Sequence, residues 1–389
     1  MPAGSTTTSS STTIVSQNLK PRYGLFPIRH QEIWTLHDLL VSKHWKADEI
    51  NYGDILAWYE SLSKEEQDMI DMILAFFSEA DGIVGSHISR NMAELCDAVP
   101  EIAMFEGQKA GNECVHRVVY AKIIDVVISD PIKKEKLFNA IESFPCVQKK
   151  AAWILGYKDD PQFDIGEKIF AMVLGEMLQF SASFAIPDWY RANNVDNGFT
   201  HSNHLISADE GLHGRAGITY LNYFGRGDNH GEQDLGIKIP SQERAHKMVK
   251  EVVEIECEFV DTILGKGFVG LTTEMMHQYI KVVADGILVA LDYEKIYNET
   301  NPFNFIDTTA LMAIGNFFET KTAEYEHADI INLPNEVFRT EESATIQKES
   351  RRKFRRSEFV EENNEQGEDE DDEWYVNKME ELANKRIKS

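Results

Sequence analysis

The sequence places an acid and an imidazole three residues apart at two separate points. Glu113 and His116 lie in GNECVHRVVY (111–120), and Glu210 and His213 lie in SADEGLHGRAGITY (207–220). Side chains at positions i and i+3 of a helix lie on the same face. We expect both pairs to face a protein interior, where such groups are costly unless they have partners. Each Glu-x-x-His pair is weak evidence by itself.

Each pair follows an acid that interrupts an apolar helical stripe. Asp81 comes 32 residues before Glu113, and Glu176 comes 34 residues before Glu210. A single inward acid is commonly a misassigned face or a satisfied hydrogen bond, but here the same order occurs twice. The chain therefore repeats a unit of an inward carboxylate, a turn and Glu-x-x-His. The two stripes are Ile70, Ile73, Leu74, Phe77 and Val84, and Ile169, Met172, Val173, Phe180 and Phe184.

Two such units packed face to face would gather four carboxylates and two imidazoles at one point in a helical bundle. Carboxylates can bridge two metal ions or bind one, and each imidazole can supply a terminal nitrogen. The set matches the dinuclear sites of ferritin-like bundles, with one Glu changed to Asp. A structural zinc site, with four Cys or His ligands, fits poorly. We predict that two transition-metal ions are bound by Asp81, Glu113, His116, Glu176, Glu210 and His213.

Long helical periods dominate residues 21–335, which predicts an all-α, ferritin-like helical bundle with the dinuclear site in its core. Individual helices are expected over 63–84, 167–184, 244–265, 272–296 and 308–328. Residues 1–20 are rich in Ser and Thr and predict a disordered leader. Residues 336–389 predict a charged, flexible tail whose last residues regain helical periodicity and are a candidate for docking on a partner.

Charge and cysteine usage exclude several classes of protein. A net charge of −26 argues against binding nucleic acid or an anionic membrane surface. The sequence contains no run of 18 or more apolar residues, so no transmembrane helix is predicted. The N-terminus lacks the features of a signal or transit peptide. The widely spaced Cys96, Cys114, Cys146 and Cys257 indicate free thiols in a reducing compartment. We expect a cytoplasmic protein.

Tyr120 lies four residues after His116, so its ring should lie beside the predicted metal pair. Two interpretations remain open from the residues alone. Tyr120 can be a core tyrosine whose hydroxyl is hydrogen-bonded, with Asp81 as a natural acceptor. Beside a metal centre that activates dioxygen, a phenol is also the side chain most readily oxidised to a radical.

Several longer stretches carry a family resemblance. They include YGLFPIRHQEIW (23–34), AFFSEADGIV (75–84), LFNAIESFPCVQKKAAW (137–153) and HSNHLISADEGLH (201–213). The sequence resembles the small, radical-generating subunit of class I ribonucleotide reductase. The resemblance implies that the six residues above are metal ligands and that Tyr120 is the radical site. It also implies that Phe180 and Phe184 form an apolar pocket around Tyr120.

The same resemblance implies a path that carries the radical equivalent to a separate large subunit. Trp45 and Asp209, together with His116, occupy the family positions that begin this path. Asp209 could also hydrogen-bond the second nitrogen of His116, as is usual for a metal-bound imidazole. The path requires a tyrosine in the C-terminal tail, for which Tyr375 is the candidate.

The implied function is that of the small subunit of ribonucleoside-diphosphate reductase, with a large catalytic subunit as partner. The family implies a homodimer, or a heterodimer with a small-subunit paralogue. We expect two iron ions in a di-iron-oxo centre, with manganese or a mixed Mn/Fe pair as alternatives, because carboxylate and imidazole sites accept several metals. Two other functions stay open: an oxidase that acts without a large subunit, and a non-catalytic paralogue that pairs with an active subunit.

The chain departs from the family pattern at a few positions. Ala208 and Gly286 stand where the family commonly has Arg, and Arg117 and Val118 stand where it often has Ser-Glu. We expect these four residues to lie close to the metal site. The chain also ends in RIKS in place of a short acidic-aromatic ending.

Overall fold

A computed structural model describes residues 20–226, 235–265 and 267–306 of the chain. All of them belong to one compact unit within residues 1–319. Three predictions lie outside the described residues: the leader up to residue 19, the helix over 308–328, and the tail over 336–389 with Tyr375.

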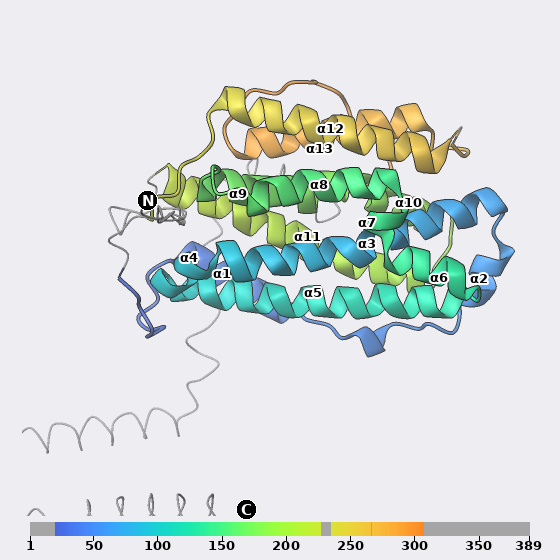
Figure 1. The fold of residues 1–389 in the computed structure, drawn as a ribbon, viewed down its shortest axis with the longest axis horizontal. Helices are drawn as coiled ribbons and strands as arrows, with labels where there is room; N and C mark the ends of the chain where they lie inside the picture. Colours follow the sequence, from blue (N-terminus) through green and yellow to red (C-terminus); the bar gives the residue numbers. More distant parts are fainter. Residues whose placement is uncertain (1–19, 227–234, 266, 307–389) are drawn as a thin grey trace, which may run out of the picture. The chain divides into compact units, whose positions relative to one another are not determined.

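The described residues confirm the predicted all-α class (Figure 1). The one β contact among them is an isolated bridge between Phe268 and Leu271. The α-helices are α1 (Gln31–Ser42), α2 (Ile55–Ser61), α3 (Lys64–Asn91), α4 (Ala93–Ala98), α5 (Pro100–Val127), α6 (Pro131–Phe138), α7 (Ala140–Ser143), α8 (Pro145–Asp159), α9 (Ile165–Val173), α10 (Ser181–Ala192), α11 (Gly198–Tyr220), α12 (Gln242–Leu264) and α13 (Thr273–Ala290). A 3₁₀ turn η1 (Ala47–Glu49) and two π-helical turns, η2 (Leu174–Gln179) and η3 (Leu221–Gly225), complete the set.

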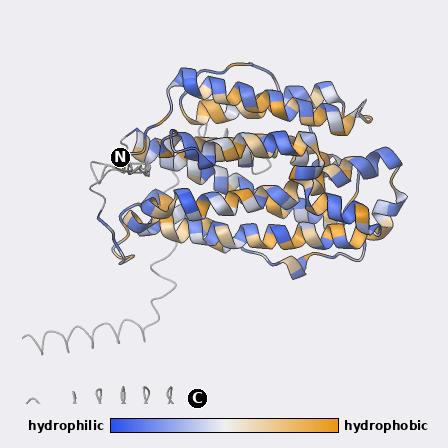
Figure 2. Cartoon of the chain, viewed as in Figure 1, coloured by the Kyte–Doolittle hydropathy of each residue, from blue (hydrophilic) through white to orange (hydrophobic). Residues whose placement is uncertain are grey.

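Four helical segments form the core bundle: α3, α5, the run from α9 through η2 to α10, and α11. The helix α3 packs along α5, and α11 packs against α9, η2, α10 and α5. The paired helices α12 and α13 form a further layer, in which α12 lies against α8 and η2 (Figure 1). The helices carry apolar and polar residues side by side, as expected for amphipathic segments (Figure 2).

Local sequence explains where the core helices begin. Ser63 caps α3 by accepting a hydrogen bond from the Glu66 amide, and the Glu66 carboxylate accepts one from the Ser63 amide. Asp164 and Glu167 make the same reciprocal pair at the start of α9. Such capping boxes satisfy amide groups that a helix start leaves without partners.

The predicted helix over 244–265 is confirmed by α12, whereas the helix predicted over 272–296 ends early, at Ala290. Asp292 has a positive φ of 55°, which an α-helix does not tolerate. The Asp285 carboxylate then accepts backbone hydrogen bonds from residues 296–298 and folds the chain back onto α13. This side-chain capture is not visible in hydrophobic periodicity.

The segment predicted as one helix over 167–184 is interrupted. Its middle is the π-helical turn η2, all of whose residues are buried. A π turn closes i to i+5 hydrogen bonds and so departs from the 3.6-residue period on which the prediction rests. The whole stretch Ile165–Ala192 is long and apolar enough to resemble a membrane span, but its most apolar window is entirely buried inside the protein, as in a core helix.

A buried ion pair supports the end of η2. Lys150 on α8 and Glu256 on α12 are both fully buried, with 2.8 Å between Nζ and Oε2. Lys150 also donates to the Gln179 carbonyl, and Glu256 accepts a hydrogen bond from the Ala182 amide. The Gln179 carbonyl and the Ala182 amide lie at the end of the π turn, where the regular backbone hydrogen-bonding pattern is interrupted. The ion pair therefore supplies the hydrogen-bond partners that this interruption removes. The Lys150 ammonium also lies 3.5 Å from the centre of the Phe76 ring.

We expect Lys150→Met to destabilise the protein by about 3–5 kcal/mol, because it leaves the buried Glu256 charge without its partner. Urea unfolding followed by circular dichroism measures this change. The double variant Lys150→Met/Glu256→Leu removes both charges and should recover much of the loss. A double variant as unstable as the single one would contradict this account.

Candidate metal centre

The six predicted ligands converge in the core from four helical segments. Asp81 comes from α3, Glu113 and His116 from α5, Glu176 from η2, and Glu210 and His213 from α11, and all six are buried. They form two overlapping groups in which the candidate ligand atoms lie within 4.8 Å of one another. The group we name position 1 is Asp81, Glu113, His116 and Glu210, and the group we name position 2 is Glu113, Glu176, Glu210 and His213.

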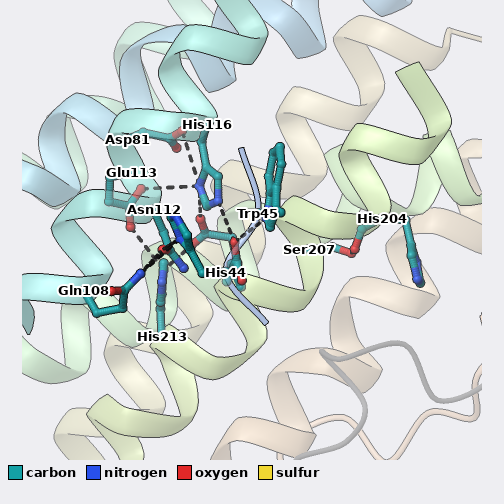
Figure 3. A network of polar contacts seen from close by, with 12 residues as sticks. His44, Trp45, Asp81, Gln108, Asn112, Glu113, His116, His204, Ser207 and His213 are labelled. Carbon is teal, nitrogen blue, oxygen red and sulfur yellow. Dashed lines mark hydrogen bonds and ion pairs between the residues drawn. The ribbon is translucent and has the colours of Figure 1, made fainter. Parts of the chain in front are cut away.

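The two shared carboxylates lie between the two imidazoles. His116 Nδ1 is 3.1 Å from a Glu210 oxygen and 3.7 Å from a Glu113 oxygen. His213 Nδ1 is 3.1 Å from the other Glu113 oxygen and 3.4 Å from the other Glu210 oxygen. Figure 3 shows Glu113 with contacts to both His116 and His213. Glu113 and Glu210 are therefore placed where a carboxylate could bridge two ions.

These close approaches lack the geometry of hydrogen bonds. Both oxygens of Asp81, Glu113 and Glu210, and Nδ1 of both histidines, are buried without a hydrogen-bond partner. Each such buried group costs roughly 1–3 kcal/mol. Nitrogen and oxygen lone pairs that share a small volume and have no donors are the set that a metal ion would satisfy, so the residues fit a dimetal centre.

Electrostatics shows that the cluster is short of positive charge. Burial disfavours the charged His213 imidazole, but Glu210 and Glu113 outweigh burial and raise its pKa to about 10. Burial also raises the pKa of Asp81 well above its usual value, and it raises the pKa of Glu176 to about 7 against the opposing charge of Lys109. Bound protons thus balance part of the negative charge that metal cations would otherwise balance.

The second nitrogen of His116 has a fixed partner. His116 Nε2 lies 3.1 Å from Asp209 Oδ2, and Trp45 Nε1 donates to the same oxygen over 2.9 Å. The predicted hydrogen bond between Asp209 and His116 is therefore present. It places the His116 proton on Nε2 and leaves Nδ1 for a metal. The rings of Trp45 and His116 also stack, with 5.9 Å between their centres.

Tyr120 is fully buried, but the predicted hydrogen bond to Asp81 is absent. The Tyr120 hydroxyl and both Asp81 oxygens have no hydrogen-bond partner, and Asp81 instead faces His116 at 3.9 Å from Nδ1. Burial, followed by the charge of Asp81, raises the pKa of Tyr120 well above its usual value. The phenol is consequently held in its protonated form.

The apolar surroundings of Tyr120 are built around Phe77. Its ring stacks on Tyr120 with 4.8 Å between centres and an interplanar angle of 7°. Phe180 and Phe184 both pack against Phe77 and against each other. The structure thus brings the predicted pocket residues close to Tyr120, with Phe77 as the ring in direct contact. Sequence reasoning placed Phe77 on the inward stripe but did not connect it with Tyr120.

One more residue of the site was missed. Lys109 is buried on α5, and its Nζ lies 2.5 Å from Glu176 Oε1. Its spacing, four residues before Glu113, puts it on the ligand face of the helix and could have identified it. Arg117 and Val118, which we expected close to the metal site, both have exposed side chains on α5. Ala208 and Gly286 are partly buried.

Comparison with known proteins agrees with this geometry. A sequence model described as "Ribonucleotide reductase, small chain" matches residues 22–302. The chain belongs to the ribonucleotide reductase small-chain family.

Individual relatives support this assignment. The "Ribonucleoside-diphosphate reductase small chain" of Spisula solidissima is 34% identical over 314 residues, covering 81% of this chain and 78% of the relative. The corresponding small subunit of Dictyostelium discoideum is 35% identical over 336 residues, covering 86% and 94%. Among solved structures, the ribonucleotide reductase Rnr4 homodimer of Saccharomyces cerevisiae aligns with a TM-score of 0.64 at 25% identity, covering 79% of this chain and 90% of that one.

We expect Glu113→Ala to lower the metal content of reconstituted protein from about two ions per chain to fewer than one, because Glu113 belongs to both positions. Elemental analysis after desalting measures this content. Glu101→Gln is the matched control, since Glu101 is a buried carboxylate on the same helix that pairs with Arg22 at a distance from the cluster. Equal metal loss in both variants would argue against this ligand assignment.

Proposed function

We propose that this chain is the small subunit of a cytoplasmic ribonucleoside-diphosphate reductase, an oxidoreductase active only with a large catalytic subunit. In this proposal Tyr120 carries a radical after one-electron oxidation, and the large subunit uses the radical equivalent to reduce ribonucleotides to deoxyribonucleotides. The observation that carries the proposal is the set of six buried candidate ligands, most of whose donor atoms have no hydrogen-bond partner, with a fully buried phenol beside them. Family membership supplies the reaction.

Asp81, Glu113, His116 and Glu210 would hold one metal ion, and Glu113, Glu176, Glu210 and His213 the other. The donor set suits two iron ions, and it also accepts manganese or one ion of each. When bound, such a centre supplies dioxygen activation and the oxidising power to remove an electron from a phenol.

The protein prepares Tyr120 for one-electron oxidation. Loss of an electron from the phenol is accompanied by loss of its hydroxyl proton, and Asp81 is the carboxylate whose charge acts most strongly on that hydroxyl. Tyr120, Phe77 and Phe180 are each no more than 1% exposed, so water and reductants are kept from the ring. A phenoxyl radical formed there would be protected by the packing itself.

The hydrogen-bonded group of His116, Asp209 and Trp45 provides the start of a path to the partner. Asp209 accepts from both rings and so couples the ligand to the indole. Trp45 is buried, whereas its neighbours Lys43, His44 and Lys46 are exposed. The path therefore approaches the surface at the segment between α1 and η1. In the proposal Tyr375 in the tail continues it toward the large subunit.

We also propose that the subunit is a dimer, either with itself or with a small-subunit paralogue. Met104 and Val118 are 41% and 44% exposed and lie on one face of α5 together with Gly107 and Gly111. Small and apolar residues on an exposed helix face allow close packing of a second chain. The relative of known structure named above is a homodimer.

Tyr120→Phe should abolish the organic radical signal in electron paramagnetic resonance after aerobic reconstitution with iron and lower reductase activity by about 100-fold or more. Metal content should stay near wild type, because Phe preserves the ring packing. Tyr279→Phe is the control, since Tyr279 is equally buried but lies on α13, outside the cluster. Persistence of the signal in Tyr120→Phe would refute the tyrosyl assignment.

Trp45→Phe should keep the Tyr120 signal but lower turnover with the large subunit by about 10-fold or more, because it removes the indole that donates to Asp209. Trp34→Phe serves as control, since Trp34 stacks on His37 in α1, whereas Asp209 is hydrogen-bonded to Trp45 and His116. Substrate oxidation by the chain alone, unaffected by Trp45→Phe, would favour the oxidase alternative instead.

A further inference from the structure

A buried cation contacts one end of the ligand cluster. Lys109 is 5% exposed, and its ammonium lies 2.5 Å from Glu176 Oε1. The Lys109 side chain therefore places an ammonium group within the protein core, against a candidate ligand.

This charge acts on the two positions unequally. Glu176 belongs to position 2 alone, whereas Asp81 and His116 belong to position 1 alone. Among the ion pairs of the described residues, Lys109 is the one Lys or Arg side chain paired with a candidate ligand. A metal ion at position 2 must share Glu176 with an ammonium group, and the like charges repel. No such competition exists for Asp81.

A small cavity distinguishes the same end of the cluster. Its volume is about 20 Å³, room for about one water molecule. Glu176 and His213 line it together with Lys109, Glu106 and Tyr220, while Asp81 and His116 do not. Position 2 thus has space for a hydrating water beside it, whereas the residues specific to position 1 are enclosed by protein.

We propose that Lys109 makes the two metal positions unequal, so that a divalent ion fills position 1 first and binds position 2 more weakly. This proposal rests on the dimetal centre of the proposed function. Lys109 pairs with Oε1 of Glu176 and leaves the other carboxylate oxygen available to a metal ion. It therefore lowers the metal affinity of position 2 without preventing binding there. The shared ligands Glu113 and Glu210 remain available to both ions.

The test is a titration of the metal-free full-length chain with Mn²⁺, in which free Mn²⁺ is followed by electron paramagnetic resonance. We expect two binding steps whose Kd values differ by about 10-fold or more. Lys109→Gln should tighten the second step by about 10-fold and leave the first within about 3-fold, because it removes the competing charge while keeping an amide donor near Glu176.

Two control variants isolate the charge. Lys109→Arg keeps the charge and should keep two separated steps. Lys168→Gln removes a lysine that is also buried but bonds to Asn91 and lies outside the cluster, and it should not alter either step. The proposal would be overturned if the two Kd values of Lys109→Gln differed as much as those of the wild type. Equal Kd values for the two steps of the wild type would also overturn it.

A measurement on the wild-type chain covers the case in which Lys109→Gln does not fold. Crystals with one equivalent of Mn²⁺ should show anomalous scattering at position 1, and equal peaks at both positions would overturn the proposal. Two ions bound with equal affinity would leave the proposed function intact and reject this inference alone. Failure of the wild type to bind Mn²⁺, iron or a mixed pair would reject the dimetal function itself.

Discussion

The architecture depends on the burial of four carboxylates and two imidazoles at one point. Desolvation of such groups is so unfavourable that they persist in a core only when cations or protons balance them. In this structure the imbalance is visible as orphaned lone pairs and as a His213 imidazole whose pKa is raised to about 10. Four helical segments converge to hold the cluster, and their packing keeps all six side chains buried.

The cluster also sets requirements on the surrounding core. Glu176 sits on a π turn, and that turn leaves backbone groups that the buried Lys150–Glu256 pair satisfies from two other helices. Phe76 lies beneath the Lys150 ammonium and packs against Phe180. Support for the ligand turn and packing of the pocket near Tyr120 are therefore parts of one contiguous region. The irregular backbone at the site is stabilised by polar groups that do not themselves approach the metal positions.

Much of the candidate site was predictable because helical spacing converts directly into shared faces. Asp81, Glu176 and the two Glu-x-x-His pairs needed only a period of 3.6 residues and the cost of burying charge. The early end of α13 and the π turn were not predictable, since Asp285 captures backbone amides 11 to 13 residues away and η2 departs from the regular period.

The sequence by itself determined the class of fold, the identity and order of the six candidate ligands, and the position of the phenol four residues after His116, because these follow from residue types and local spacing. Only the tertiary structure shows that Glu113 and Glu210 belong to both metal positions, since this depends on how α5 and α11 face each other. It also decided that Asp81 turns to the ligands instead of to Tyr120, and that Lys109 pairs with Glu176. These outcomes are set by competition among groups far apart in the chain, which local spacing does not contain.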